Sequence, residues 1–117
     1  MTHKDLEVWK KSMDLVEDVY KLMKQLPESE KYGLISQIKR SSISVPSNIA
    51  EGAARGSTKE FIRFLDIASG SLSELETQLL LVQRLGFTNS NDSLEDQINS
   101  LGKMLYGLKL SLKKKIN

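Results

Sequence analysis

Residues 57–86 read STKEFIRFLDIASGSLSELETQLLLVQRLG, and this stretch decides the fold class. Its apolar residues recur at alternating intervals of four and three, which keeps one stripe of a helix facing a neighbouring helix. The stripe consists of Phe61, Leu65, Ala68, Leu72, Leu75, Leu79 and Val82. Ser57 and Glu60 match a capping box at the start, and Gly86 suits a C-terminal cap. The stretch therefore predicts one long helix.

Upstream, residues 3–26 have the same periodicity and predict another helix, which Pro27 ends because proline has no amide hydrogen to donate. This helix carries two apolar rows. The row expected to face the core is Leu6, Trp9, Met13, Val16, Tyr20 and Met23. The second row, which exceeds what one bundle needs, is Val8, Leu15, Val19, Leu22 and Leu26. One buried stripe per helix would satisfy a monomeric bundle.

Residues 29–54 predict a further helix, with Pro46 inside it. A proline within a helix removes one backbone hydrogen bond and typically kinks the helix. The alternative is a break, with residues 41–47 forming a serine-rich loop. The apolar phase continues across the proline, which favours the kink.

The small residues at 68–71 suit a close approach of another helix to the one at 57–84.

Downstream, residues 89–92 have turn chemistry, and Asp92 with Glu95 suits the start of a last helix that continues to the end of the chain. Four helices joined by short connections should run alternately up and down. The sequence thus predicts an all-α, antiparallel up-down-up-down four-helix bundle, with the second helix kinked at Pro46. A length of 117 residues indicates that positions 1–117 form a single domain.

Composition excludes several classes of site. The chain has no cysteine and one histidine, His3. These counts exclude a disulfide framework, a thiolate zinc site, a cysteine nucleophile and, within one chain, a histidine-based metal site. No run approaches the roughly 20 apolar residues of a membrane span, and the first 26 residues are too charged for a secretory signal. We therefore expect a cytoplasmic protein without membrane attachment, metal or cofactor.

Charge is unevenly distributed, although the net charge is only +2. Residues 31–63 hold six basic and two acidic side chains, and residues 103–117 hold five basic side chains and no acidic one. The predicted topology gathers basic residues at one end of the bundle, namely Lys4, Arg55, Lys59, Arg63, Lys113, Lys114 and Lys115. It gathers acidic residues at the other end, namely Glu28, Glu30, Asp92, Glu95 and Asp96. The acids near helix starts and the terminal lysines complement the helix dipole.

Lys59 and Arg63 do not fit that explanation, because they lie in the first turns of a helix, where positive charge is unfavourable. They are also four residues apart on one face, although Asp66 could offset part of their repulsion. One interpretation is a phosphate-binding surface that Lys39 and Arg40 extend, and the other is a solvated face. No aromatic residue interleaves these basic residues, so stacking of nucleic-acid bases is not indicated.

Two polar residues lie beside the apolar positions near residue 50. Glu51 could be partly buried, and we expect it to form an ion pair with an arginine such as Arg40. Asn48 is expected to fix helix register through hydrogen bonds. Glu74 and Glu76 face different sides of a helix and make poor acid–base partners. Without paired carboxylates or a phosphate-binding glycine loop, the sequence predicts no enzyme.

Surplus apolar residues also occur on the long helix at 57–84. They are Ile62, Phe64, Ile67, Leu80 and Leu81. If this surface is exposed it marks a protein interface, so we expect a homo-oligomer. A protein–protein scaffolding bundle with no nucleic-acid role is the alternative function.

Several motifs resemble a bacterial family of small helical bundles. The opening LEVWK at residues 6–10, the NIAEG motif at residues 48–52 and the segment GSL-x-ELE at residues 70–76 carry the resemblance. So do Pro27-x-x-Glu30-x-Tyr32-Gly33-Leu34 and QIKRS at residues 37–41. The chain resembles the proteins encoded in intervening sequences of bacterial 23S ribosomal RNA genes. It is also similar to the accessory variability determinant of diversity-generating retroelements.

The resemblance implies a four-helix bundle that assembles into a ring, with five as the expected number of subunits. In the retroelement branch it implies an accessory protein that binds a reverse transcriptase and nucleic acid, either RNA or DNA, through basic residues. In this chain those residues are Lys39, Arg40, Arg55, Lys59 and Arg63. The structural motif that accompanies them is Asn48, Glu51 and Gly52.

Overall fold

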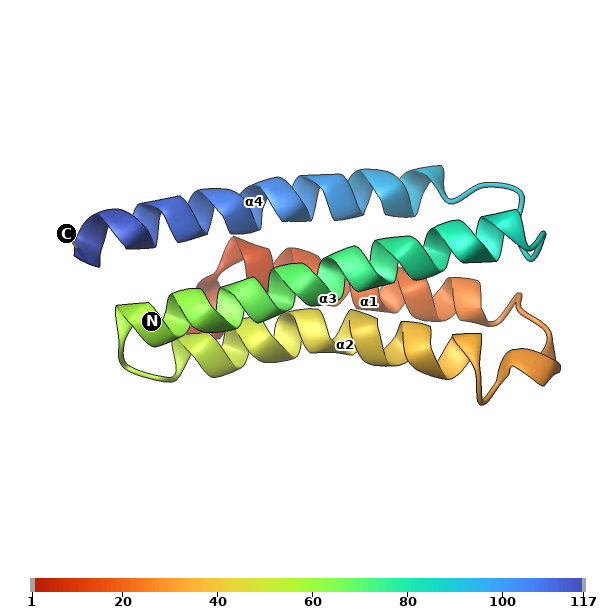
Figure 1. Ribbon diagram of the computed structural model, residues 1–117, viewed down its shortest axis with the longest axis horizontal. Coiled ribbons are helices and arrows are strands. Elements are labelled where there is room, and N and C mark those ends of the chain that lie inside the picture. The colour runs from red at the N-terminus through yellow and green to blue at the C-terminus, as the bar shows by residue number, and fades with distance from the viewer. Residues whose placement is uncertain (1, 117) are drawn as a thin grey trace.

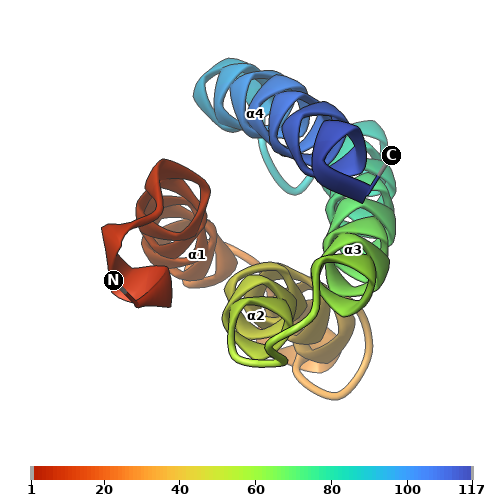
Figure 2. The ribbon, with the colours of Figure 1, turned by 90° about the vertical axis from the view of Figure 1, so that its left-hand side faces the viewer.

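The computed structural model describes residues 2–116, which form helices and no β-strand. The four α-helices are α1 (Glu7–Met23), α2 (Leu34–Ala53), α3 (Thr58–Arg84) and α4 (Asp92–Ile116). Successive helices run in opposite directions (Figure 1), and each packs on the next while α4 also contacts α1. Figure 2 shows them in this order around a common axis. The predicted up-down-up-down four-helix bundle is confirmed.

The bundle is elongated, with principal extents of 48 × 23 × 20 Å. The start of α1, the turn between α2 and α3 and the end of α4 lie at the same end (Figure 1). This arrangement brings together the segments that carry most of the predicted basic cluster. Within residues 2–116, no helix has both the length and the apolar character that crossing a membrane requires.

Three helix boundaries differ from the prediction. Short 3-10 helices at His3–Asp5 and Glu28–Glu30 replace the expected first turns of α1 and α2. α1 ends at Met23, three residues earlier than predicted. α2 begins only at Leu34, because Gly33 has a backbone conformation outside the helical region, with φ −107° and ψ −107°. The connection between α1 and α2 is therefore longer than the sequence pattern indicates.

Pro46 lies inside α2, which is continuous from Leu34 to Ala53. The alternative of a serine-rich loop at residues 41–47 is therefore wrong. The kink at Pro46 stays a prediction. Ser41 and Ser42 are buried, and their hydroxyl groups donate to the carbonyl oxygens of Ile38 and Lys39, at 3.1 and 2.9 Å. Hydroxyl groups that bond to the preceding turn of their own helix can be buried at low cost.

The row of α1 that is buried in the core is not the one predicted, although Leu6 and Trp9 of the predicted row also pack against the core. The row expected to be surplus faces the core, and all of its members are at most 7% exposed, namely Val8, Leu15, Val19, Leu22 and Leu26. In the row expected to face inward, Met13 is 40% exposed and only Met23 is buried. Ser12, a fully buried residue, continues the core row between Val8 and Leu15, so its polar side chain hides the true stripe in the sequence. Its hydroxyl donates to the carbonyl oxygen of Trp9 at 2.7 Å.

α2 and α3 form the most extensive helix–helix contact in the bundle. Small side chains line it, and the hydroxyl groups of Ser44 and Ser71 are 2.8 Å apart. The hydroxyl oxygen of Ser41 also lies 2.6 Å from Oε1 of the buried Gln78. Ser71 belongs to the thin middle of α3, where the sequence predicted a close approach. The same contact holds the α2–α3 turn in place, where three of the predicted basic residues lie.

Candidate nucleic-acid interface

The five predicted basic residues fall into two groups. Arg55, Lys59 and Arg63 lie around the turn between α2 and α3, at the end of the bundle where α4 also ends (Figure 1). Lys39 and Arg40 lie in the first half of α2, roughly 20 Å away at 1.5 Å of rise per residue. The chain therefore does not bring all five residues into one surface. We call Arg55, Lys59 and Arg63 the turn cluster.

Arg55 is paired with a carboxylate four residues earlier in the chain. Its Nη2 donates to Oε1 of Glu51 at 2.6 Å, and both side chains are about half exposed. The expected ion pair of Glu51 with an arginine is therefore present, but the arginine is Arg55 and not Arg40, and Glu51 is exposed where partial burial was expected. A spacing of four residues at the end of α2 places Arg55 within reach of Glu51 on the same face.

Arg63 is also neutralised by its own helix. Its Nε and Nη2 donate to the two carboxylate oxygens of Glu60, at 2.8 and 3.1 Å. The hydrogen bond from Arg63 lowers the pKa of Glu60, and the hydrogen bond to Glu60 raises the pKa of Arg63. Glu60 therefore offsets the unfavourable positive charge in the first turns of α3.

This ion pair leaves the predicted capping box half formed. The hydroxyl of Ser57 accepts a hydrogen bond from the amide of Glu60 at 3.1 Å, as expected of an N-cap. The carboxylate of Glu60, which would return to the amide of Ser57 in a full box, binds Arg63 instead. Asp66, which was expected to offset the positive charges of Lys59 and Arg63, contacts Lys109 of α4 at 3.1 Å.

A buried aromatic ring orders both arginines of the turn cluster. The guanidinium carbons of Arg55 and Arg63 lie 4.9 and 4.5 Å from the centroid of Phe64, which is 8% exposed. Cations at this distance from an aromatic ring are attracted by its quadrupole. The two charges are thus held at the α2–α3 turn by contacts with one ring, as well as by their carboxylates.

Gly52 makes room for that ring. A Cβ atom at position 52 would lie 2.7 Å from the Cβ of Phe64, which is too close, and 3.1 Å from Cδ1 of Phe61, which is a tight contact. Glycine is therefore needed where the end of α2 meets the start of α3. Asn48, one turn earlier, donates to the carbonyl and hydroxyl oxygens of Ser44 at 2.7 and 2.9 Å. The motif Asn48, Glu51 and Gly52 thus shapes the surface that carries Arg55 and Arg63.

Lys59 has no carboxylate within ion-pair distance among residues 2–116. The same holds for Lys4 and for the three lysines at 113–115, which are exposed in the last turn of α4. Because these segments share one end of the bundle, their charges add to the turn cluster (Figure 1). Lys59 and the α4 lysines therefore supply the uncompensated positive charge at this end.

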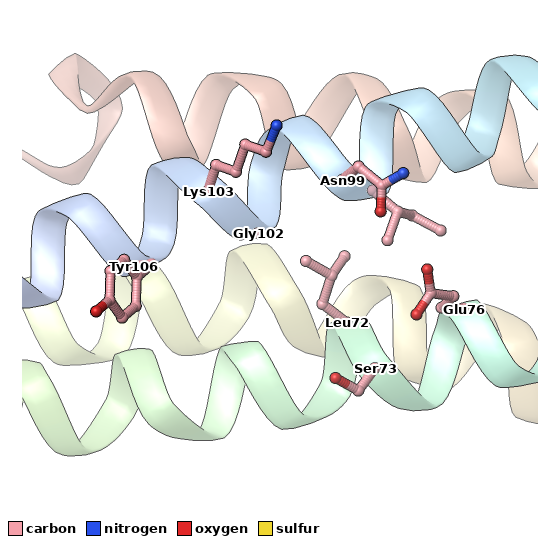
Figure 3. A pocket seen from close by; sticks show the side chains of 8 residues that line it. Leu72, Ser73, Glu76, Asn99, Gly102, Lys103 and Tyr106 are labelled. Atoms are coloured by element: carbon pink, nitrogen blue, oxygen red, sulfur yellow. The ribbon is translucent and has the colours of Figure 1, made fainter.

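The groove between α3 and α4 is a second feature with ionisable groups (Figure 3). Its volume is about 590 Å³, and its polar lining residues include Ser73, Glu76, Asn99 and Lys103. Glu76 also lies near Glu95 of α4, whose Oε1 is buried and has no hydrogen-bond partner among residues 2–116. Burial, followed by the charge of Glu76, raises the pKa of Glu95. Sequence reasoning missed this carboxylate pair, because its members lie on different helices.

These groups do not form a metal site or a recognisable catalytic constellation. In the described part of the chain, no three His, Cys, Asp or Glu residues are grouped so that they could hold a metal ion. Glu76 is the one carboxylate among the lining residues of the groove. A general acid or base also needs a partner placed to bind or activate a substrate.

The fold and the basic surface define a class of protein, namely small antiparallel four-helix bundles with one basic end. The family model of the 23S rRNA-intervening sequence proteins matches residues 4–107. The chain belongs to this family, as the sequence motifs indicated.

A solved structure from Bacteroides thetaiotaomicron has the same fold. It is described as a protein of unknown function from the S23 ribosomal protein family, and it is 27% identical to this chain. The match covers 87% of this chain and 97% of that chain, with a TM-score of 0.79. No curated protein matches the sequence.

Proposed function

We propose that the protein is a non-catalytic, oligomeric bundle that binds RNA through its basic end. The observation that carries this proposal is the turn cluster. The guanidinium groups of Arg55 and Arg63 both contact the ring of Phe64, and Lys59, which lies between them in the sequence, has no ion-pair partner among residues 2–116. The family's description, which refers to 23S ribosomal RNA, agrees with an RNA-related role.

The ion pairs of the turn cluster are compatible with phosphate binding. A guanidinium group has five N–H donors. Arg55 uses one of them on Glu51, and Arg63 uses two on Glu60. Both arginines therefore retain donors for a phosphate, and their positions are fixed before it arrives. Such preorganisation lowers the entropic cost of binding.

Assembly of several copies would strengthen this surface. Each copy contributes one basic end, and linked contacts bind a long RNA far more tightly than a single contact does. The expected ring of five subunits would present five turn clusters. A reverse transcriptase is the protein partner that the resemblance suggests, and the same basic end is the surface that we propose for the nucleic acid of such a complex.

The test is a titration of a labelled structured RNA at several salt concentrations, followed by fluorescence anisotropy. Affinity should fall steeply with salt, because phosphate contacts release bound counterions. The variant Lys59→Gln/Arg63→Gln should weaken binding by about ten-fold or more and make the salt dependence shallower. Arg84→Gln, which removes a positive charge at the opposite end of α3, serves as the control and should bind like the unaltered protein.

Salt-independent binding, or equal weakening in the control variant, would contradict the proposal. The scaffolding function would then be favoured, since exposed apolar side chains on α3 could bind another protein. Ile67, Leu80 and Leu81 are 40%, 45% and 44% exposed. That function predicts a defined oligomer or complex in light scattering, which dissociates when Leu80 and Leu81 are replaced by glutamine. Added RNA should not change the size of this oligomer or complex.

A further inference from the structure

A second basic surface lies between α1 and α2, away from the turn cluster. Lys39 of α2 extends over Tyr20 of α1, and its ammonium nitrogen is 4.8 Å from the ring centroid. Tyr20 and Lys39 are both half-buried, so the contact is held in place by the packing of the two helices. The sequence did not reveal this pair because its members are 19 positions apart. The structure thus places an aromatic ring among basic residues, contrary to the sequence-based expectation.

Tyr20 also lines a hollow in the surface of α1. The hollow has a volume of about 440 Å³, and its walls include Val16, Lys21 and Lys24 as well as the ring. The hollow therefore offers apolar and aromatic surface together with two ammonium groups. A planar ring beside lysines is the arrangement that holds successive bases and phosphates of a single strand.

The charges of this surface favour an anionic partner. Lys24 and Lys39 have no carboxylate within ion-pair distance among residues 2–116, whereas Lys21 contacts Asp18 at 3.8 Å. Glu17 is the one carboxylate among the lining residues of the hollow. Lys39 thus contacts the ring from α2, and Lys24 shares the lining of the hollow with the ring, while Glu17 and Asp18 are the acidic side chains beside them.

A second aromatic residue occurs in the connection between α1 and α2. Tyr32 precedes α2 by two residues, and its side chain is 88% exposed. The ammonium nitrogen of Lys31 lies 5.6 Å from its ring centroid. The connection that follows α1 therefore carries another exposed ring with a lysine beside it.

We propose that the α1–α2 surface formed by Tyr20, Lys24 and Lys39 binds single-stranded RNA, with a base against the tyrosine and phosphates at the lysines. This inference rests on the proposed RNA-binding function. It adds a second contact surface and specifies that the RNA bound there is single-stranded. The ring of the turn cluster is not available to a base, because Phe64 is buried beneath Arg55 and Arg63. An unpaired strand can present its bases to a ring, and a duplex cannot.

The experiment compares a labelled oligouridine with a labelled RNA duplex in anisotropy titrations at low salt. Tyr20→Leu keeps apolar volume and removes the aromatic face, and it should weaken oligouridine binding by about five-fold or more. Lys24→Gln/Lys39→Gln should weaken it comparably. Neither variant should change duplex binding, whereas Lys59→Gln/Arg63→Gln should weaken the binding of both RNAs.

A gain-of-binding variant guards against effects of misfolding. Glu17→Gln removes the opposing charge from the wall of the hollow and should tighten oligouridine binding by roughly two- to five-fold at low salt. The matched control is Glu74→Gln, which removes an exposed charge on α3 and should leave affinity unchanged. Cross-linking of an oligonucleotide carrying 5-iodouridine, mapped by mass spectrometry, should identify Tyr20.

The outcomes separate the two proposals. If the Tyr20, Lys24/Lys39 and Glu17 variants all bind oligouridine like the unaltered protein, this inference is overturned while the turn cluster retains its role. If only the turn-cluster variant binds normally, the proposed function of that cluster fails and the α1–α2 surface remains. If Tyr20→Leu dissociates an oligomer in light scattering while oligouridine binding is unchanged, the surface is a subunit interface and the inference is overturned.

Discussion

At position 52, a hydrogen atom in place of a side chain sets how closely α2 and α3 approach. The nearest neighbours of an added Cβ would be Phe64 and Phe61, which both belong to α3. The same glycine thus determines the position of the ring on which Arg55 and Arg63 lie. A single residue links the packing of two helices to the geometry of the candidate interface.

Gly52→Ala should therefore destabilise the fold, by about 1–3 kcal/mol, because the methyl group overpacks the contact with Phe64. Urea unfolding followed by circular dichroism measures the change. Gly70→Ala is the matched control, since within residues 2–116 no group beyond the nearby backbone of α3 lies within 4 Å of its added Cβ, and it should stabilise α3 by up to about 1 kcal/mol. Equal effects at both positions would contradict the argument.

Glu95 makes stability depend on pH. Its Oε1 is buried, and none of the residues that the structure describes forms a hydrogen bond with it. Burial, then the charge of Glu76, raises its pKa above the ordinary value of 4.5. The folded state binds this proton more tightly than the unfolded state. The stabilisation is therefore fully present below pH 4.5 and is lost as the pH rises through the folded-state pKa.

Glu95→Gln should remove that dependence. The variant should be more stable than the unaltered protein at neutral pH, and its unfolding free energy should vary less between about pH 5 and about pH 7. Urea titrations at both pH values measure this, with Glu74→Gln as the control at an exposed site of α3. A pH profile identical to that of the unaltered protein would show that Glu95 does not titrate as argued.

At the scale of the helices, α4 is tied to α3 by a cluster that involves a largely buried lysine. The ammonium group of Lys109, whose side chain is 16% exposed, lies 3.1 Å from Asp66 and 3.2 Å from Ser69. Its aliphatic stem is therefore covered while its charge is paired. Such an interaction is worth more than an ion pair between fully exposed side chains.

Lys109→Ala should cost about 1 kcal/mol of stability and speed hydrogen exchange in the second half of α4, because the substitution removes both packing and an ion pair. Lys113→Ala, at an exposed position in the last turn, is the control and should change exchange little. Unchanged exchange in the Lys109 variant would mean that apolar packing alone holds α4.

At the scale of the whole molecule, the charge of the basic end has two sources. The arginines of the turn cluster are paired with Glu51 and Glu60. Unpaired positive charge comes from Lys59 and from residues 113–115. The lysines of α4 complement its helix dipole, as the sequence indicated, and the bundle topology places them at the same end as the turn cluster (Figure 1).

Replacing the three lysines at 113–115 by glutamine should therefore weaken RNA binding and make its salt dependence shallower. The slope of the logarithm of the binding constant against the logarithm of the salt concentration should fall in magnitude by about one for each phosphate that is no longer bound. Anisotropy titrations at several salt concentrations measure the slope. The unfolding free energy should fall by no more than about 1 kcal/mol for each lysine, the usual range of a dipole contribution. Reduced stability without any change in RNA affinity would leave the lysines only a structural role.

The sequence by itself determined the features that depend on neighbouring residues. The number of helices, the stripe of α3, the cap at Ser57 and the glycine at 86 follow from periodicity and local hydrogen bonding. The short connections then favour antiparallel neighbours, so the topology could be predicted too. The sequence also indicated that the basic residues of the turn cluster lie near one another, because they flank the turn that joins α2 to α3.

Only the tertiary structure decided which groups from different helices meet. Two apolar rows of α1 had suitable spacing, and packing against the other helices selected the one that contains Ser12. The pairing of Tyr20 with Lys39 and the approach of Glu76 to Glu95 each join residues from different helices. Periodicity gives the direction of a side chain on its own helix, but it contains no information on the register between helices. That register depends on how side chains of all four helices fill the shared core.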